Sequence, residues 1–147
     1  MQQNDALSAS GRGLIRLGAV LFLFGLLTGL AVPAMQLPRM ALASHLEGLF
    51  NGLLLMVVGL FWERLALGPR HRAVAFGAIV YAAFANWFAT LLSAATGAAA
   101  MMPLAGGGST GAKPVEFIVA ALLLSLSLAM IAGVGLLIYG LRKAPAA

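Results

Sequence analysis

Four long apolar stretches leave this chain few ways to fold. They cover residues 14–34, 42–62, 73–96 and 116–141. About 20 apolar residues in a helix are enough to cross the roughly 30 Å hydrocarbon core of a bilayer. Of the 147 residues, 62% are hydrophobic and only 9% are charged, so a water-soluble domain would expose too much apolar surface. The sequence therefore predicts an all-α bundle of four transmembrane helices.

The basic residues predict how this bundle is oriented. Two of the nine Lys and Arg residues, Arg39 and Lys113, fall on one side of the membrane. The other seven fall on the opposite side: Arg12, Arg16, Arg64, Arg70, Arg72, Arg142 and Lys143. Because cytoplasmic loops are enriched in positive charge, both termini are expected in the cytoplasm. The pI near 10.9 then reflects topology and anionic lipid headgroups, and no nucleic-acid partner is expected.

We expect one four-helix membrane domain over 14–141, between an N-terminal tail at 1–13 and a C-terminal tail at 142–147. The first apolar stretch is too long for a signal-peptide core, so it is expected to be retained. The connection at 97–114 is longer than most, which indicates either a functional lid or a plain loop. Its GGGSTG run lacks the strand before it and the Lys after it that a phosphate-binding loop requires.

Several catalytic chemistries are excluded by composition. The chain has no cysteine, so it has no thiolate nucleophile and no cysteine-ligated metal. Its single aspartate, Asp5, lies in the predicted tail, which excludes a membrane-embedded Ser-His-Asp triad. A zinc site is also disfavoured, because it needs three or four protein ligands and the apolar stretches offer one histidine.

Among the polar side chains in the apolar stretches are an imidazole, a carboxylate and two amides, those of His45, Glu47, Asn51 and Asn86. In a helix that enters from the non-cytoplasmic side, His45 is one turn inside and Asn51 is about 9 Å deeper. The third stretch runs the opposite way and brings Asn86 to a similar depth. Glu47 and Asn51 share a helix face, whereas His45 and Asn51 are about 120° apart. Buried polar groups cost several kcal/mol unless they pair or bind a ligand, so these residues are functional candidates.

Simpler roles remain open for each of them. His45 could be hydrated at the membrane interface, and Glu47 could pair with Arg39 or with Asn51. The two asparagines could also bond each other as a link between helices. Trp87, directly after Asn86, lies too deep to belong to the interfacial aromatic belt.

Small residues mark one face on each of the first two apolar stretches. Gly25 and Gly29 are four apart on the first, and Gly48 and Gly52, followed by Gly59, lie on the second. Such faces allow close helix packing, an oligomer interface or room for a flat cofactor. Haem needs only one axial imidazole and leaves its other face open as a Lewis acid. His45 is therefore the candidate metal ligand, with Gly48 and Gly52 as candidates to line the cofactor.

Three runs carry a family resemblance: PRMALASHLEGLFNGLLLMVVGLFW, FANWFATLLSAATGAAAMMPLAGGG and LSLSLAM. They resemble the bacterial hydroxylaminobenzene mutases, four-helix membrane enzymes that convert arylhydroxylamines to 2-aminophenols. The likeness covers most of 14–141. The spacing from His45 to Asn51 and the Ala85-Asn86 pair also resemble styrene oxide isomerase, a trimeric membrane enzyme with ferric haem b bound to a histidine.

The resemblance implies roles for the polar residues. His45 would be the proximal ligand of ferric haem b, and Asn51 and Asn86 would hold the migrating oxygen. Glu47 is a candidate proton shuttle. The resemblance also implies a homotrimer in the bacterial inner membrane. Styrene oxide isomerase has an aspartate and a tyrosine on its third helix where this chain has Ala82 and Thr90, so the details of the chemistry differ.

The function expected from these features is an isomerase of aromatic compound degradation, specifically of nitroaromatic catabolism. It would move the hydroxylamine oxygen from nitrogen to the ortho ring carbon, without an external reductant. An epoxide-to-carbonyl isomerase and a haem-binding subunit are alternatives. A small transporter is a third, although the first and fourth stretches offer a polar path only Thr28, Ser125 and Ser127.

Overall fold

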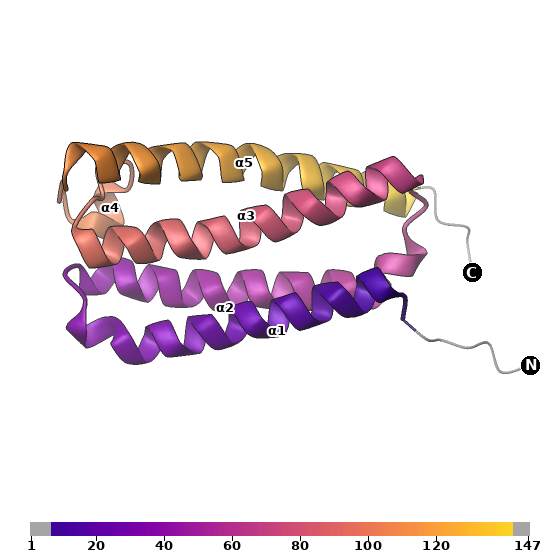
Figure 1. The fold of residues 1–147 in the computed structure, drawn as a ribbon, viewed down its shortest axis with the longest axis horizontal. Coiled ribbons are helices and arrows are strands. Elements are labelled where there is room, and N and C mark those ends of the chain that lie inside the picture. The colour runs from indigo at the N-terminus through magenta and orange to yellow at the C-terminus, as the bar shows by residue number, and fades with distance from the viewer. Residues whose placement is uncertain (1–6, 143–147) are drawn as a thin grey trace, which may run out of the picture.

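The computed structural model describes residues 7–142, and the four predicted membrane helices are all present there (Figure 1). They are α1 (Ala9–Ala31), α2 (Pro38–Phe61), α3 (Pro69–Thr96) and α5 (Lys113–Arg142). A one-turn helix, α4 (Pro103–Gly106), lies in the connection between α3 and α5. Each long helix is long and apolar enough to cross a membrane, and the described residues form no strand. The predicted all-α four-helix fold is confirmed.

Each long helix begins before the apolar stretch that predicted it. Ser8 caps α1, where its hydroxyl oxygen accepts the N–H of Gly11 at 3.1 Å. Pro38 and Pro69 open α2 and α3, because proline at the first turn loses no hydrogen bond. Helix α1 therefore takes in part of the predicted tail at 1–13. Residues 1–6, which include Asp5, and residues 143–147 of the other tail lie outside the described residues.

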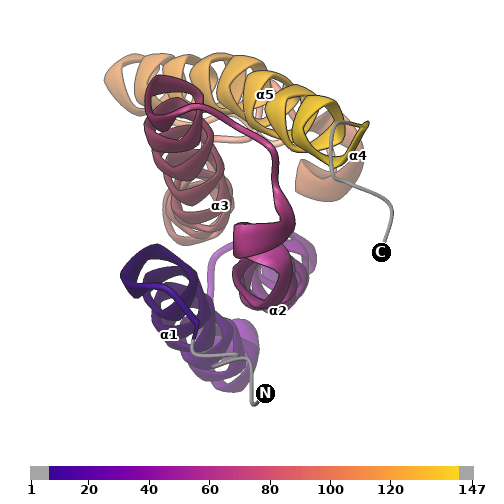
Figure 2. The same cartoon turned by 90° about the vertical axis from the view of Figure 1, so that its right-hand side faces the viewer.

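The long helices are arranged around α3. Viewed along the bundle, α1, α2 and α3 lie together, and α5 lies against α3 on the side away from α1 (Figure 2). The contact between α1 and α2 is the most extensive, and α5 packs mainly against α3. Fully buried apolar side chains from three helices form the core, among them Leu14, Leu21, Leu55, Val58 and Ile79. Helices α2 and α3 are thus in direct contact along the bundle.

Paired glycines bring the backbones of α1 and α2 together. Gly11, Gly18 and Gly25 on α1 meet, respectively, Gly59, Gly52 and Gly48 on α2. A methyl group on Gly52 would lie 2.7 Å from the carbonyl oxygen of Gly18, closer than such atoms can approach. The seven-residue spacing on α1 was not part of the sequence prediction, which used Gly25 and Gly29. Close helix packing, one of the three roles considered for these glycines, is confirmed.

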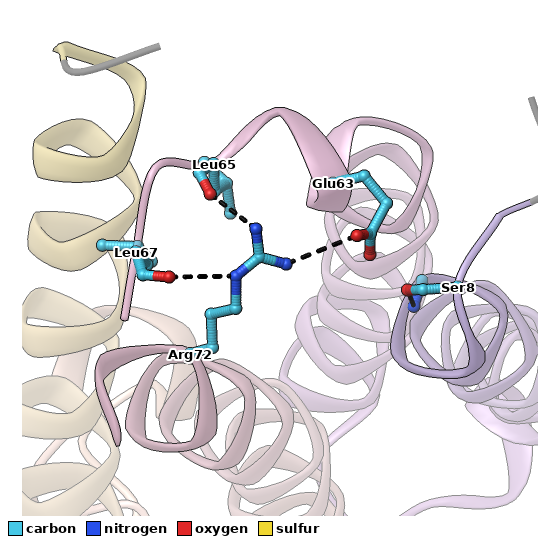
Figure 3. Close-up of polar contacts among 6 residues, drawn as sticks. Ser8, Glu63, Leu65, Leu67 and Arg72 are labelled. Carbon is cyan, nitrogen blue, oxygen red and sulfur yellow. Dashed lines mark hydrogen bonds and ion pairs between the residues drawn. The ribbon is translucent and has the colours of Figure 1, made fainter. Parts of the chain in front are cut away.

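The connection between α2 and α3 is held by Arg72, which lies in the first turn of α3 (Figure 3). Its guanidinium donates to the carbonyl oxygens of Leu65 at 2.7 Å and Leu67 at 3.2 Å. It also pairs with Glu63 at 3.6 Å. The start of α1 and the end of α5 lie at this same end of the bundle (Figure 1). Both observations fit a membrane-surface position for this end.

The long connection at 97–112 is tied down at the opposite end. Helix α3 ends at Gly97, whose φ of 75° lies in the left-handed region that favours glycine. The carboxylate of Glu116 accepts the N–H of Ala100 at 3.1 Å and the N–H of Gly111 at 2.7 Å. Within the connection, Ser109 donates to the carbonyl of Gly97 at 2.9 Å. These bonds fix both ends of the segment that the sequence left as either a lid or a plain loop.

Candidate functional site

Glu47, Asn51 and Asn86 form one hydrogen-bonded cluster between α2 and α3. The side-chain amide nitrogen of Asn51 donates to Glu47 Oε2 at 3.1 Å. The amide nitrogen of Asn86 donates to the same oxygen at 2.5 Å. The sequence left two partners open for Glu47, Arg39 and Asn51, and in the structure the partner is Asn51. The structure also links the two asparagines through the carboxylate instead of directly.

The helices explain why these three side chains meet. Glu47 and Asn51 are four residues apart, so they lie on one face of α2. Antiparallel packing of α3 brings Asn86 to the same level. Asn51 is 7% exposed, and the other two are half-buried. A carboxylate in such surroundings is costly unless donors surround it, and hydrogen bonds to a charged acceptor are the stronger kind.

The geometry leaves one carboxylate oxygen available for chemistry. Both amides use Oε2, and within residues 7–142 Glu47 Oε1 has no hydrogen-bond partner. Each amide nitrogen carries a second hydrogen as well, and each side chain has an oxygen that can accept. The cluster can therefore exchange a proton at Oε1 while two further N–H groups orient a polar substrate atom.

His45 is held by α1 through a single hydrogen bond. Its Nδ1 lies 2.8 Å from the carbonyl oxygen of Gly25. A carbonyl can only accept, so Nδ1 carries the hydrogen and Nε2 keeps its lone pair. Histidines that bind metals commonly donate their other ring N–H to a backbone carbonyl in this way. The donor chemistry of His45 fits a single axial metal ligand.

A groove of about 460 Å³ lies beside His45, where α1 ends and α2 begins. The sequence predicts that this end of the bundle is the non-cytoplasmic one. Its other lining residues are apolar or small: Leu26, Gly29, Leu30, Val32, Pro33 and Leu42. Within residues 7–142, no three His, Asp or Glu side chains gather into a group that could hold a metal ion. The groove therefore suits a flat apolar group that needs one protein ligand.

His45 and Asn86 lie on different sides of α2. His45 contacts α1, whereas Asn86 bonds Glu47 on the side of α2 that faces α3. At about 100° per residue, His45 and Glu47 lie about 160° apart around α2. The bond from Asn86 to Glu47 places the two residues at one level of the bundle, but a shared level alone does not bring side chains to one side of a helix.

Gly48 and Gly52, the candidates to line a cofactor, pack against the backbone of α1. A methyl group on Gly48 would lie 2.5 Å from the α carbon of Gly25, and Gly52 is equally close to Gly18. The face that these glycines form is therefore occupied by the backbone of α1. The cause is the matching glycine series on α1, which uses the small-residue face for helix packing.

Sequence reasoning missed the polar residues around Trp87. Ser44 donates to the backbone carbonyl of Trp87 at 3.0 Å, and the indole N–H donates to Thr28 at 3.0 Å. Ser44 is fully buried and Thr28 is 4% exposed. Thr90, noted above as a departure from styrene oxide isomerase, donates to the carbonyls of Asn86 and Trp87. The available signal was a small polar residue, Ser44, one turn before Glu47.

A larger cavity, of about 720 Å³, lies at the other end of the bundle. Trp62, Glu63, Arg72 and Phe76 are among its lining residues, and the polar ones appear in Figure 3. Trp62 follows the end of α2 and is fifteen positions after Glu47, which is about 22 Å at the rise of a helix. This cavity is therefore distant from the intramembrane cluster.

Comparison with known proteins shows what the chain is related to. A family model described as styrene oxide isomerase matches residues 10–142. The chain is 51% identical over 136 residues to hydroxylaminobenzene mutase HabB of Ectopseudomonas oleovorans, which covers 92% of this chain and 83% of that protein. It is 41% identical over 127 residues to hydroxylaminobenzene mutase HabA of the same organism, which covers 86% of this chain and 94% of that protein. No solved structure matches the chain.

These relationships agree with the structure. The relatives are mutases, and the chain shares most of its length with them, so it is an isomerase. Its four long apolar helices make it a multi-pass membrane protein. The match to the family model runs through all four helices and includes His45, Glu47, Asn51 and Asn86. The chain belongs to the styrene oxide isomerase family.

Proposed function

We propose that the chain converts hydroxylaminobenzene and related arylhydroxylamines to 2-aminophenols by intramolecular hydroxyl transfer. Two relatives named hydroxylaminobenzene mutase, at 51% and 41% identity, support this substrate class. The observation that carries the proposal is the cluster in which Asn51 and Asn86 donate to Glu47 within the membrane bundle. A carboxylate inside an apolar bundle costs more free energy than an apolar residue would, which favours a functional role for Glu47.

The reaction needs proton transfer but no external reductant. The N–O bond breaks, a C–O bond forms at the ortho carbon, that carbon loses its proton and the nitrogen gains one. Substrate and product are isomers, so atoms and electrons balance. The protein must therefore supply a group that accepts the ring proton and returns a proton to nitrogen.

In this proposal Glu47 is the proton-transfer group. Its Oε1 accepts the proton that leaves the ortho carbon, while the two asparagine N–H groups keep Oε2 in place. The second N–H of Asn51 and of Asn86 holds the migrating oxygen close to the ring. Retention of that oxygen keeps water from attacking the ring at the para position.

We also propose that His45 Nε2 would hold haem b, in the groove beside Gly29. When bound, ferric haem would supply a Lewis acid. The chain's own contribution there is the Gly25 carbonyl, which fixes the tautomer of His45. Because His45 and Glu47 lie on different faces of α2, haem binding and proton transfer can be tested by separate substitutions.

We place the protein in the bacterial inner membrane with both termini in the cytoplasm, as the basic residues predict. An uncharged arylhydroxylamine partitions readily into the bilayer because of its apolar ring. The homotrimer implied by the resemblance stays a prediction.

The family description favours a second candidate function, isomerisation of an epoxide such as styrene oxide to a carbonyl compound. This reaction also moves a hydrogen without net redox change. The two candidates differ in the bond that opens, N–O in one and C–O in the other. They are therefore separated by their products.

The test is to supply each substrate to membranes that contain the chain and to identify the products by chromatography. The proposal expects 2-aminophenol from hydroxylaminobenzene, with no oxygen incorporated from ¹⁸O-labelled water. Phenylacetaldehyde from styrene oxide, without any 2-aminophenol, would favour the second function. Purified protein that is fully active without a Soret band would remove haem from the proposal while leaving Glu47 in place.

A further inference from the structure

Trp87 links three helices through its polar atoms. Its backbone carbonyl accepts a hydrogen bond from Ser44 of α2 at 3.0 Å, and its indole N–H donates to Thr28 of α1 at 3.0 Å. The residue itself belongs to α3. Both hydroxyl partners are buried, so water does not compete for these bonds. Trp87 is therefore fixed to α1 and to α2 at the same time.

The contacts around the ring allow it one orientation. Thr28 donates its own hydroxyl hydrogen to the carbonyl of Phe24 at 2.8 Å, which leaves the threonine oxygen free to accept from Trp87. The ring of Phe24 stacks on the indole, with centroids 5.1 Å apart and planes at 28°. On the α2 side, a methyl group on Gly48 would lie 3.1 Å from Trp87 Cδ1. The indole thus fills the space between Phe24 and Gly48.

The contacts of Trp87 are adjacent to the catalytic cluster. Asn86 precedes Trp87 in α3, and Ser44 lies three residues before Glu47 in α2, which is about one helical turn. The bond from Ser44 to Trp87 and the bond from Asn86 to Glu47 therefore connect the same two turns of the two helices. A shift of α3 that lengthens one bond also lengthens the other.

We propose that Ser44 and Thr28 are positioning residues that act through Trp87 to hold the Asn86 amide against Glu47. The inference rests on the proposed function, in which Glu47 transfers the proton. Small displacements matter in such a site, because a misplacement of about 1 Å can lower a catalytic rate about a hundredfold.

The main test uses Thr28→Val, which keeps the side-chain shape and removes the hydroxyl, and Thr28→Ser, which keeps the hydroxyl. The purified full-length protein is assayed with hydroxylaminobenzene. Thr28→Val is expected to lower kcat about tenfold with KM nearly unchanged, and Thr28→Ser is expected to retain most of the activity. Ser44→Ala should behave like Thr28→Val. Ser127→Ala is the matched control, because Ser127 is exposed and bonds only its own helix at Leu123.

A second readout does not depend on turnover. The infrared carboxyl band that disappears in Glu47→Gln reports the hydrogen bonds to Glu47. Thr28→Val is expected to shift this band, and Thr28→Ser is expected to leave it unchanged. In a protein that already carries Asn86→Ala, the addition of Thr28→Val is expected to cause no further shift. Thermal unfolding in detergent identifies any variant that fails to fold.

The outcomes separate the two proposals. A folded Thr28→Val variant with the wild-type kcat and an unshifted Glu47 band overturns the positioning role. A band shift of the same size with and without Asn86 also overturns it, because Trp87 would then not act through Asn86. If the wild-type protein forms no aminophenol, the proposed function fails, and the infrared series still decides the positioning role.

Discussion

The two sides of α2 differ in how they are held. On the α1 side, glycines bring two backbones together, as where Gly18 meets Gly52. On the α3 side, the contact is polar: Asn86 donates to Glu47, and Ser44 donates to the carbonyl of Trp87. Tight backbone packing gives stability without chemistry, whereas buried polar side chains cost stability and can react. In the proposed function, α1 supports α2 and the interface of α2 with α3 carries the proton transfer.

The largest expected effect is on the polar side. Glu47→Gln removes the proton acceptor but keeps a side chain of the same shape, so kcat should fall by about 10² to 10⁴. The melting temperature in detergent should change little. Glu63→Gln, at the half-exposed ion pair with Arg72, is the control and should keep wild-type turnover. Equal losses in both variants would contradict the assignment.

His45→Ala tests the polar side chain of α2 that bonds α1. The variant is expected to insert in the membrane and to lose haem, seen as loss of the Soret band, together with turnover. His71, exposed near the start of α3, provides the control, because His71→Ala should keep both. Retention of the band in His45→Ala would assign haem to another ligand.

The glycine contact should show its importance in stability. Gly52→Ala places a methyl group 2.7 Å from the Gly18 carbonyl, and the resulting overpacking should cost about 1–3 kcal/mol of unfolding free energy. Gly135→Ala is the matched control in α5, where a methyl group meets no atom within 4 Å. Unfolding in a denaturing detergent series measures both. If Gly52→Ala is as stable as Gly135→Ala, the close contact of α1 with α2 is not the source of stability.

Asn51→Ala should have the smallest effect on stability. It removes one of two donors to Glu47, and hydrogen bonds between side chains in membrane proteins contribute about 0.6 kcal/mol on average. The loss of kcat should still be clear, about tenfold, because Glu47 becomes less well oriented. The same unfolding series and the aminophenol assay measure the two effects. If Asn51→Ala lost much stability but kept full activity, the α3 side of α2 would serve stability and not the reaction, which would contradict the comparison.

Much of the fold could be predicted because the bilayer demands long apolar helices. The starts of the helices were missed because the prediction followed hydropathy and not the capping signals at Ser8, Pro38 and Pro69. The pairing of Glu47 with Asn51 was predictable from their spacing of four residues. The partner helix for each polar residue was not, because it depends on tertiary packing.

Two parts of the site show this limit. His45 and Asn86 were expected at a similar depth, and the sequence did not show that the His45 side chain turns toward α1. Gly48 and Gly52 were candidates to line a cofactor, and the sequence did not show that their face packs against the glycine series on α1. In both cases the missing information was the rotation of α2 about its own axis, which is set by contacts with α1. The bond from Ser44 to the carbonyl of Trp87 depends on the same rotation of α2.

The most direct test of the account is the isotope effect on kcat for hydroxylaminobenzene deuterated at both ortho carbons. If Glu47 takes the ring proton, Glu47→Gln should make that step slow, and a clear deuterium effect should appear that is larger than in the wild-type protein. A Glu47→Gln protein that turns over at the wild-type rate, with the same isotope effect as the wild type, would contradict it.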